Sequence, residues 1–185
     1  AAPDENIDLY PTMNDPYFSV KIAARDEFSN YGYDGQIHDI KKRSEEIIRH
    51  GFDISPHQIF VKNFLSFQTP FNSLLLFHGL GTGKTCSAIG VCEEMRDYLK
   101  QLGLKKKIVI VANPNVQDNF KLQLFDERDM VLEDNVWTMK KGCNGAKMLR
   151  EVNPSGQPVA KNHIVAQVRA IISKYYEFSG YIQLS

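Results

Sequence analysis

The chain has 185 residues, which is enough for one domain with a sizeable core. Apolar residues make up 43%, charged residues 24%, and the formal net charge is zero, as in an ordinary globular protein. The zero charge offers no whole-chain electrostatic argument for binding nucleic acid, and no apolar run approaches the roughly 18–20 residues of a membrane span. The N-terminus is acidic, unlike a secretory signal. We therefore expect a soluble protein that does not bind a membrane.

The first part of the chain predicts an irregular N-terminal arm that leads into a surface helix. Residues 1–35 are rich in Pro, Asp, Asn and Tyr and show little periodicity, although a short helix is expected at 19–28. The segment from Asp39 to His50 carries isoleucines among charges and stops at a glycine, as a surface helix does. We assign residues 1–50 to this arm and helix.

The folded domain is expected over residues 51–185 and begins with a helix and a strand. Ser55 and Pro56 are a good N-cap and N1 pair for a helix that runs to about residue 67. A Thr-Pro pair then breaks that helix. The apolar run at 73–78 predicts the first strand of the core.

A glycine-rich turn, His-Gly-Leu-Gly-Thr-Gly-Lys-Thr at residues 78–85, follows this strand and opens the next helix. Glycines let the backbone come close to a phosphate, and the amides of the loop and helix start then converge on the anion. Lys84 can reach the β- and γ-phosphates, and Thr85 can place its hydroxyl on Mg²⁺. His78 stands where the strict motif has glycine, so the looser form applies.

This loop predicts a site for ATP and Mg²⁺. The alternative is a chance glycine-rich turn between a strand and a helix. The loop residues that we expect to bind the nucleotide are Gly79, Gly81, Thr82, Gly83, Lys84 and Thr85, of which Lys84 and Thr85 are the catalytic candidates and Thr85 the Mg²⁺ contact.

The pattern after the loop predicts an α/β unit with a parallel sheet. A helix should run from the loop to about Leu102, followed by a β-branched strand at 106–112 that reads as buried on both faces. A crossover helix is expected at 114–125, which completes a βαβ arrangement.

Beyond that unit the pattern predicts fewer regular elements. A short strand is expected at 136–138, a loop or insertion at 140–160, a helix at 161–176 and a strand at 181–184. The three cysteines are few and odd in number. Cys86 and Cys92 fall on the predicted helix after the loop, where buried free thiols are expected, as in a reducing compartment.

Two further groups of charged residues were weighed for chemistry. Asp126 to Asp129 is the only Asp-Glu-x-Asp sequence, but it follows a helical pattern and reads as a solvated helix end rather than the Walker B box that holds Mg²⁺. A basic cluster could meet a nucleic-acid backbone, with an ordinary solvated surface as the alternative. It consists of Lys140, Lys141, Lys147 and Arg150.

Several ordered segments resemble the superfamily 2 helicase-type ATPases of nucleocytoplasmic large DNA viruses, relatives of the poxvirus early transcription factor small subunit and nucleoside triphosphatase I. The resemblance covers roughly residues 50–185. It implies a P-loop NTPase fold, in which residues 51–185 form the N-terminal part of the first RecA-like lobe. The segments that carry it are His57-Gln58, Asn63 to Ser66, Thr69-Pro70, 74–89, Val109 to Phe120 and Tyr175 to Tyr181.

Within this resemblance two more sites are implied. Gln58 lies 26 residues before Lys84, where such enzymes place a glutamine that recognises adenine; the alternative is a solvated helical glutamine. Pro114 and Asn115 match a motif that touches the nucleic-acid backbone, although an ordinary strand–turn–helix reads the same way.

The resemblance implies an ATP-dependent motor or transcription-factor ATPase that remodels DNA, with viral transcription or virion proteins as partners and the virion and host cytoplasm as its location. DNA is favoured over RNA. Because a Walker B strand is missing, we expect this chain to bind nucleotide without efficient hydrolysis alone. The alternatives are a nucleotide-binding structural subunit without hydrolysis and an RNA helicase.

Overall fold

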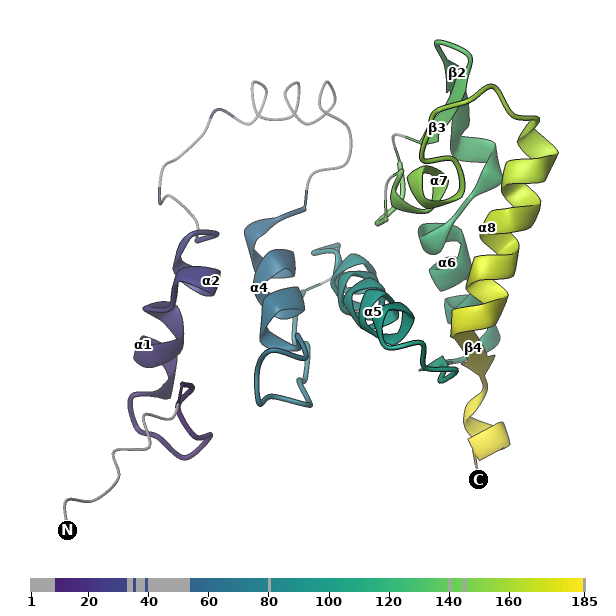
Figure 1. Ribbon diagram of the computed structural model, residues 1–185. Coiled ribbons are helices and arrows are strands. Elements are labelled where there is room, and N and C mark those ends of the chain that lie inside the picture. Colours follow the sequence, from purple (N-terminus) through teal and green to yellow (C-terminus); the bar gives the residue numbers. More distant parts are fainter. Residues whose placement is uncertain are drawn as a thin grey trace.

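The computed structural model describes residues 9–32, 35, 39, 54–79, 81–139, 141–144 and 146–184. Within them the chain is a mixed α/β structure in which α5 runs through the middle, between α4 on one side and the α6–α8 region on the other (Figure 1). The predicted surface helix from Asp39 to His50 lies outside the described residues apart from its first residue.

The helices are short except for α5 and α8. Their bounds are α1 (Phe18–Ala23), α2 (Asp26–Ser29), α4 (Pro56–Phe64), α5 (Lys84–Gln101), α6 (Pro114–Leu124), α7 (Lys147–Val152) and α8 (Lys161–Tyr175), with 3₁₀ turns η1 (Glu127–Asp129) and η2 (Tyr181–Leu184). In the described part of the chain, no helix combines the length and the apolar character needed to span a bilayer.

Two separate strand pairs are present in the described residues. The strands are β1 (Ile108–Val111) and β4 (Tyr176–Ser179), which pair in parallel, and β2 (Met130–Glu133) and β3 (Val136–Met139), which pair antiparallel. The hairpin turn uses Asp134 and Asn135, both at positive φ, as two-residue hairpins require. The parallel pair and its crossover helices confirm a small α/β sheet.

The helix predictions are largely confirmed because their end signals are local. Gln58 accepts a hydrogen bond from the Ser55 N–H (3.0 Å) at the start of α4, and Asn113 caps α6 by accepting from the Val116 N–H (3.0 Å). Gly103 takes a positive φ of 64° just after α5. The helix expected at 19–28 is instead two short helices, and the stretch at 140–160 contains α7, which was not predicted.

The strand prediction at 73–78 is wrong for this structure. Residues 71–79 have no regular secondary structure, and Leu75 and Phe77 are 86% and 94% exposed. A parallel strand persists only through hydrogen bonds to neighbours, and in the described residues the parallel sheet holds only β1 and β4. An apolar run alone therefore did not decide this element.

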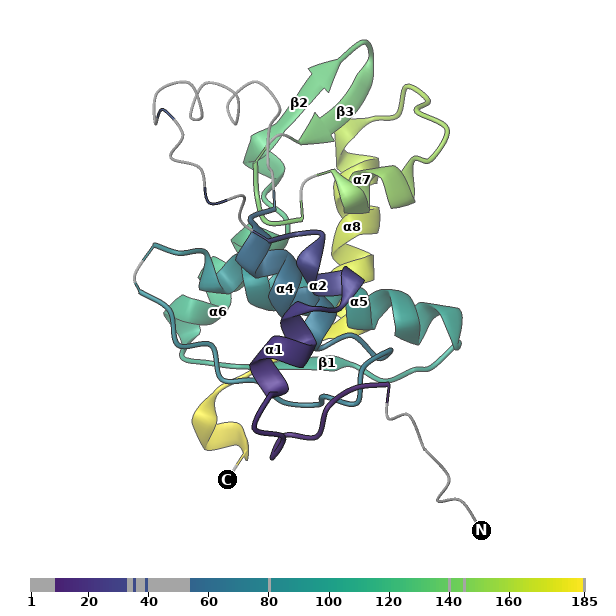
Figure 2. The ribbon, with the colours of Figure 1, turned by 90° about the vertical axis from the view of Figure 1, so that its left-hand side faces the viewer.

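Two further strand predictions need correction. The last strand is β4, at 176–179, rather than 181–184, because its register with β1 ends at Ser179 and the chain then turns into η2. The second prediction was burial of β1 on both faces, but Val109 is 49% exposed and lies opposite the exposed Glu177. In Figure 2, α4, α5, α6 and α8 lie above the level of β1. The face of the sheet that carries Val109 and Glu177 is therefore partly exposed among the described residues.

The main core lies between that covered face, α5 and the later helices. Ile89 of α5, Ile164 and Val168 of α8 and Met148 of α7 are almost fully buried there. Packing of this kind contributes about 1.5–3 kcal/mol for each large apolar side chain buried.

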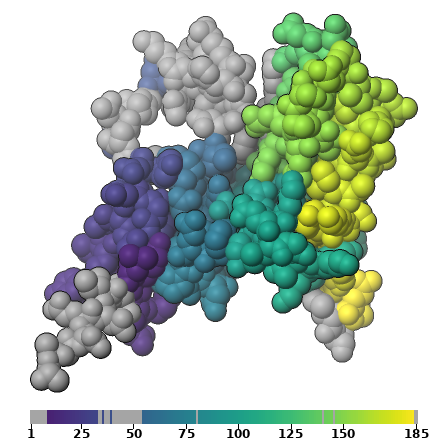
Figure 3. Space-filling view, in the orientation of Figure 1, coloured from purple at the N-terminus to yellow at the C-terminus, as the bar shows by residue number. Residues whose placement is uncertain are grey.

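A second cluster, made mostly of aromatic side chains, joins the N-terminal segment to α4. The Phe64 and Phe71 rings stack at 4.4 Å between centroids, and Phe18 packs edge-on against both. Tyr10 donates a hydrogen bond to Glu27 (2.6 Å), whose backbone carbonyl accepts from Asn63 (2.8 Å). Figure 3 shows the α1–α2 and α4 segments side by side on one flank.

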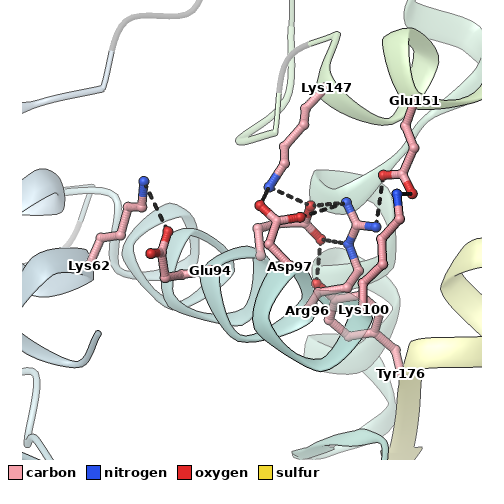
Figure 4. Close-up of polar contacts among 9 residues, drawn as sticks. Lys62, Glu94, Arg96, Asp97, Lys100, Lys147, Glu151 and Tyr176 are labelled. Carbon is pink, nitrogen blue, oxygen red and sulfur yellow. Dashed lines mark hydrogen bonds and ion pairs between the residues drawn. The ribbon is translucent and has the colours of Figure 1, made fainter. Parts of the chain in front are cut away.

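A buried ionic network centred on Arg96 joins α5 to α7 and β4 (Figure 4). The guanidinium of Arg96, which is fully buried, donates two hydrogen bonds to Glu93 (3.0 and 2.8 Å) and one to Glu151 (2.8 Å). The Tyr176 hydroxyl also donates to Glu93 (2.5 Å), and Lys100 donates to Glu151 (2.7 Å). Burial acts to lower the pKa of Arg96, but its bonds to the two glutamates raise that pKa overall.

Removing Arg96 should destabilise the fold strongly. Arg96→Met would leave Glu93, which is 4% exposed, without its main counter-charge, and we expect the free energy of unfolding to fall by about 3–5 kcal/mol. Arg169→Ala removes an exposed pair with Glu127 and should cost less than about 1 kcal/mol. Urea unfolding of both variants measures this, and equal losses would contradict it.

Candidate nucleotide-binding site

The glycine-rich loop keeps its expected backbone although the strand before it is absent. Gly81 and Gly83 adopt positive φ values of 77° and 82°, which side chains disfavour. Gly83 is the N-cap of α5, and Lys84 is the first residue of that helix. The 18-residue α5 therefore points its N-terminal amides and the positive end of its dipole toward the loop.

The Lys84 side chain lies back over the start of this loop. Its ammonium donates to the backbone carbonyls of His78 (2.9 Å) and Gly79 (2.7 Å), and the Thr82 hydroxyl donates to the same Gly79 carbonyl (2.9 Å). These contacts place the cationic group, the hydroxyl of Thr82 and the α5 amides around one short stretch of backbone. That donor set suits an anion with several oxygens, such as a polyphosphate.

The first turn of α4 holds the loop from the other side. His57 Nε2 is 2.9 Å from the Thr82 carbonyl, and Gln58 Nε2 donates to the Gly83 carbonyl at 3.4 Å. The His57 and His78 rings meet edge-on, 5.6 Å between centroids. The structure thus brings Gln58 to the predicted loop residues, and its role at adenine stays a prediction. The contact of His57 with the loop was not foreseen, although its position beside Gln58 was a usable signal.

Of the residues expected at a nucleic-acid backbone, four are exposed and lie on separate elements: Pro114, Asn115, Lys141 and Arg150. Pro114 and Asn115 form the first turn of α6, directly after the chain leaves β1. Lys141 is 80% exposed on its side chain, with its ammonium 3.9 Å from Asp129, and Lys140 lies outside the described residues. Lys147 was predicted to belong to the basic cluster. In the structure it donates to Asp97 (2.7 Å) and belongs to the ionic network around Arg96.

The acidic residues give little support for a metal site built by the protein alone. Arg128 donates to the Asp126 carboxylate within the η1 turn, and this hydrogen bond lowers the pKa of Asp126. The segment predicted to be a solvated helix end is instead the separate turn η1, and the Asp126 side chain is only 13% exposed. Among the described residues no cluster of His, Cys, Asp and Glu could hold a metal ion.

The prediction of a buried free thiol is wrong for Cys86. Cys86, in the first turn of α5, forms a disulfide with Cys143, which ties the start of that helix to the segment between β3 and α7. Cys92 is a free thiol, and burial followed by the nearby Glu93 charge raises its pKa to about 12. Sequence spacing could not reveal the pair, because 57 residues separate its members.

Several viral proteins are similar to this chain. It is 30% identical over 119 residues to a protein of Invertebrate iridescent virus 3 named "Putative helicase 087L", which covers 60% of this chain and 11% of that protein. It is 30% identical over 124 residues to "Putative ATP-dependent RNA helicase R563" of Acanthamoeba polyphaga mimivirus, covering 67% of this chain and 19% of that protein.

A shorter match reaches higher identity. A protein of Frog virus 3 named "Putative helicase 009L" is 45% identical over 56 residues, 30% of this chain and 6% of that protein. The chain thus spans no more than 19% of the length of these relatives. No family model matches the chain. No solved structure matches it either.

Substitution of the loop glycines should separate backbone strain from side-chain collision. Gly81→Ala meets nothing within 4 Å and should cost only the positive-φ penalty, about 1–2 kcal/mol. Gly83→Ala carries the same penalty and also collides with Gln58 Nε2, so its loss of unfolding free energy should be larger. Denaturant unfolding of both variants measures the difference. An equal cost would show that the Gln58 amide moves aside freely, and Gln58→Ala should relieve any excess.

The cysteine pairing predicts a simple labelling pattern. Alkylation in denaturant without reductant should add one label to the intact chain, at Cys92, and three after reduction. In the folded chain near pH 7.5, Cys92 should react slowly because its buried thiol stays protonated. Mass spectrometry reads both results, and three labels without reductant would refute the disulfide.

Proposed function

We propose that this chain is the ATP-binding front part of a superfamily 2 helicase or translocase of the kind found in large DNA viruses. The observation that carries the proposal is the loop at 78–85, where Gly81 and Gly83 adopt left-handed conformations directly before Lys84 opens α5. The similarity to viral proteins named as helicases supports it over a chance glycine-rich turn. The RecA-like character of residues 51–185 belongs to the same proposal.

The proposed roles follow from the donor groups on the loop. The backbone amides at the start of α5 and the Lys84 ammonium bind the β- and γ-phosphates of ATP, with Gly79, Gly81, Thr82 and Gly83 as the enclosing backbone. Thr85 directs its hydroxyl to Mg²⁺, which neutralises phosphate charge when it is bound. On binding, Lys84 exchanges its two carbonyl partners for phosphate oxygens.

Hydrolysis calls for groups that the described residues do not supply. The acidic turn around Asp126 is tied up by Arg128, and the parallel sheet has no acidic strand end beside the loop. We therefore propose that the 185-residue chain binds ATP without efficient turnover and that hydrolysis belongs to the longer protein represented by the relatives. The competing proposal is a nucleotide-binding assembly subunit without hydrolysis. It is favoured by the pairing of Asp126 with Arg128, because a paired carboxylate is not available to hold Mg²⁺.

Nucleic acid is the proposed substrate of the complete machine. The mimivirus relative is named as an RNA helicase, whereas the iridescent virus and Frog virus 3 relatives are named only as helicases. We propose duplex DNA, contacted by Pro114 and Asn115 at the start of α6 and by Lys140 and Lys141, with viral transcription or virion proteins as partners. Competition between duplex DNA and duplex RNA for a full-length relative, with Lys141→Glu as the variant, tests this assignment.

Loss of Lys84 should abolish most nucleotide binding by this chain. Lys84→Ala removes a charge-assisted contact to phosphate, which corresponds to about a 10- to 100-fold weaker affinity for Mg·ATP. Lys105→Ala, an exposed lysine beyond the far end of α5, is the matched control and should bind as the wild type does. Isothermal titration calorimetry measures all three. Equal affinities for the Lys84 variant and the wild type, or no binding by the wild type, would overturn the proposal.

A further inference from the structure

Two consecutive residues of α4 hold two consecutive carbonyls of the glycine-rich loop. His57 meets the Thr82 carbonyl at 2.9 Å, and Gln58 meets the Gly83 carbonyl at 3.4 Å. A carbonyl oxygen only accepts hydrogen bonds, so the contact at 2.9 Å requires that His57 carries its proton on Nε2. The edge-on contact with the His78 ring, 5.6 Å between centroids, supports this orientation of the imidazole.

The two carbonyls differ in how they are otherwise held. The Gly83 carbonyl accepts from the Ser87 N–H at 2.9 Å, which is the first backbone hydrogen bond of α5. Thr82 precedes the N-cap Gly83, and the contact to its carbonyl comes from His57, 25 residues earlier in the chain. His57 is therefore the residue that sets the direction of the Thr82–Gly83 peptide.

The orientation of this peptide matters because a trans peptide is planar, with its C=O and N–H on opposite sides. When His57 holds the Thr82 carbonyl toward α4, the Gly83 N–H must point away from α4. That N–H adjoins the free amides of the first turn of α5, where the proposed phosphate site lies. The hydrogen bond from His57 thus orients the Gly83 N–H so that it joins the other amides that face the anion.

We propose that His57 is a positioning residue for the phosphate-binding loop, with Gln58 supporting it. The inference rests on the proposed nucleotide site and deepens it. Gln58 is 8% exposed, and its amide is used at both ends, since Oε1 accepts from Ser55 N–H and Nε2 donates to Gly83. In this geometry both ends of the Gln58 amide are engaged by the protein backbone, and its Nε2 is directed to the loop.

The test compares ligands with and without a base on variants of His57. His57→Phe keeps an aromatic ring against His78 but removes the donor, whereas His57→Gln restores an N–H donor. His163→Phe, at an exposed histidine that contacts Gln167 in α8, is the matched control. Titration calorimetry with Mg·ATP, Mg·GTP and inorganic tripolyphosphate gives the affinities, and thermal unfolding checks that each variant folds.

We expect His57→Phe to weaken all three ligands by a similar factor of about three- to tenfold, the net contribution of one hydrogen bond. His57→Gln should recover most of that loss, and the control should bind as the wild type does. Gln58→Glu should likewise affect ATP and tripolyphosphate alike. A loss confined to ATP in the Gln58 variant would assign that residue to adenine and overturn its role as loop support.

The failure of this inference can be told from failure of the proposed function. If Lys84→Ala loses binding while His57→Phe keeps it, the nucleotide site stands and the positioning role falls. A readout without ligand covers the remaining case: the Gly83 amide, followed by ¹⁵N NMR, should shift and exchange faster in His57→Phe and return with His57→Gln. An unchanged Gly83 amide in the His57→Phe variant would overturn the inference even if the wild type binds no nucleotide.

Discussion

The buried ion pair between Arg96 and Glu93 is the contact on which the arrangement of this molecule depends. A charge taken out of water must be matched by an opposite charge and by hydrogen bonds, and here the partners come from three elements. Glu151 and Lys147 bring in α7, and Tyr176 brings in β4, so the far half of α5 has one position relative to the sheet. Breaking the pair would leave a charge buried alone. The network therefore fixes the far half of α5 against α7 and β4.

The near half of α5 is fixed by a disulfide and by hydrogen bonds from α4, and these contacts also hold the glycine-rich loop. The disulfide from Cys86 ties the helix start to the segment before α7, while His57 and Gln58 of α4 hold the loop carbonyls. Behind α4, Phe64 and Phe71 anchor the N-terminal segment through stacked rings. The loop therefore sits between two packed clusters, with a rigid helix whose amides face it. Such preorganisation is what a phosphate site needs, because little ordering is then left for binding to accomplish.

The uncovered surfaces of the structure are consistent with its similarity to much longer viral proteins. Leu75 and Phe77 are almost fully exposed just before the loop, and Val109 is exposed on the open face of the two-stranded sheet. Apolar residues in these positions are stabilised only when further chain covers them. The relatives extend far beyond the matched region, since the chain spans at most 19% of those compared.

Local features were predictable from the sequence, whereas pairings between distant residues were not. The caps of α4 and α6, the extent of α5 and the left-handed glycines of the loop follow from nearest-neighbour stereochemistry, so they could be read directly. The motif also marked Lys84 and Thr85, whereas Gln58 was marked only by the resemblance to viral helicases. Only the tertiary structure decided that Gln58 and His57 grip the loop, that Cys86 meets Cys143, that Lys147 serves an ion pair and that residues 73–78 stay unpaired. Each of these depends on which segments lie side by side. Burial, charge matching and hydrogen bonding between distant residues decide that arrangement, and the order of residues along the chain does not show it.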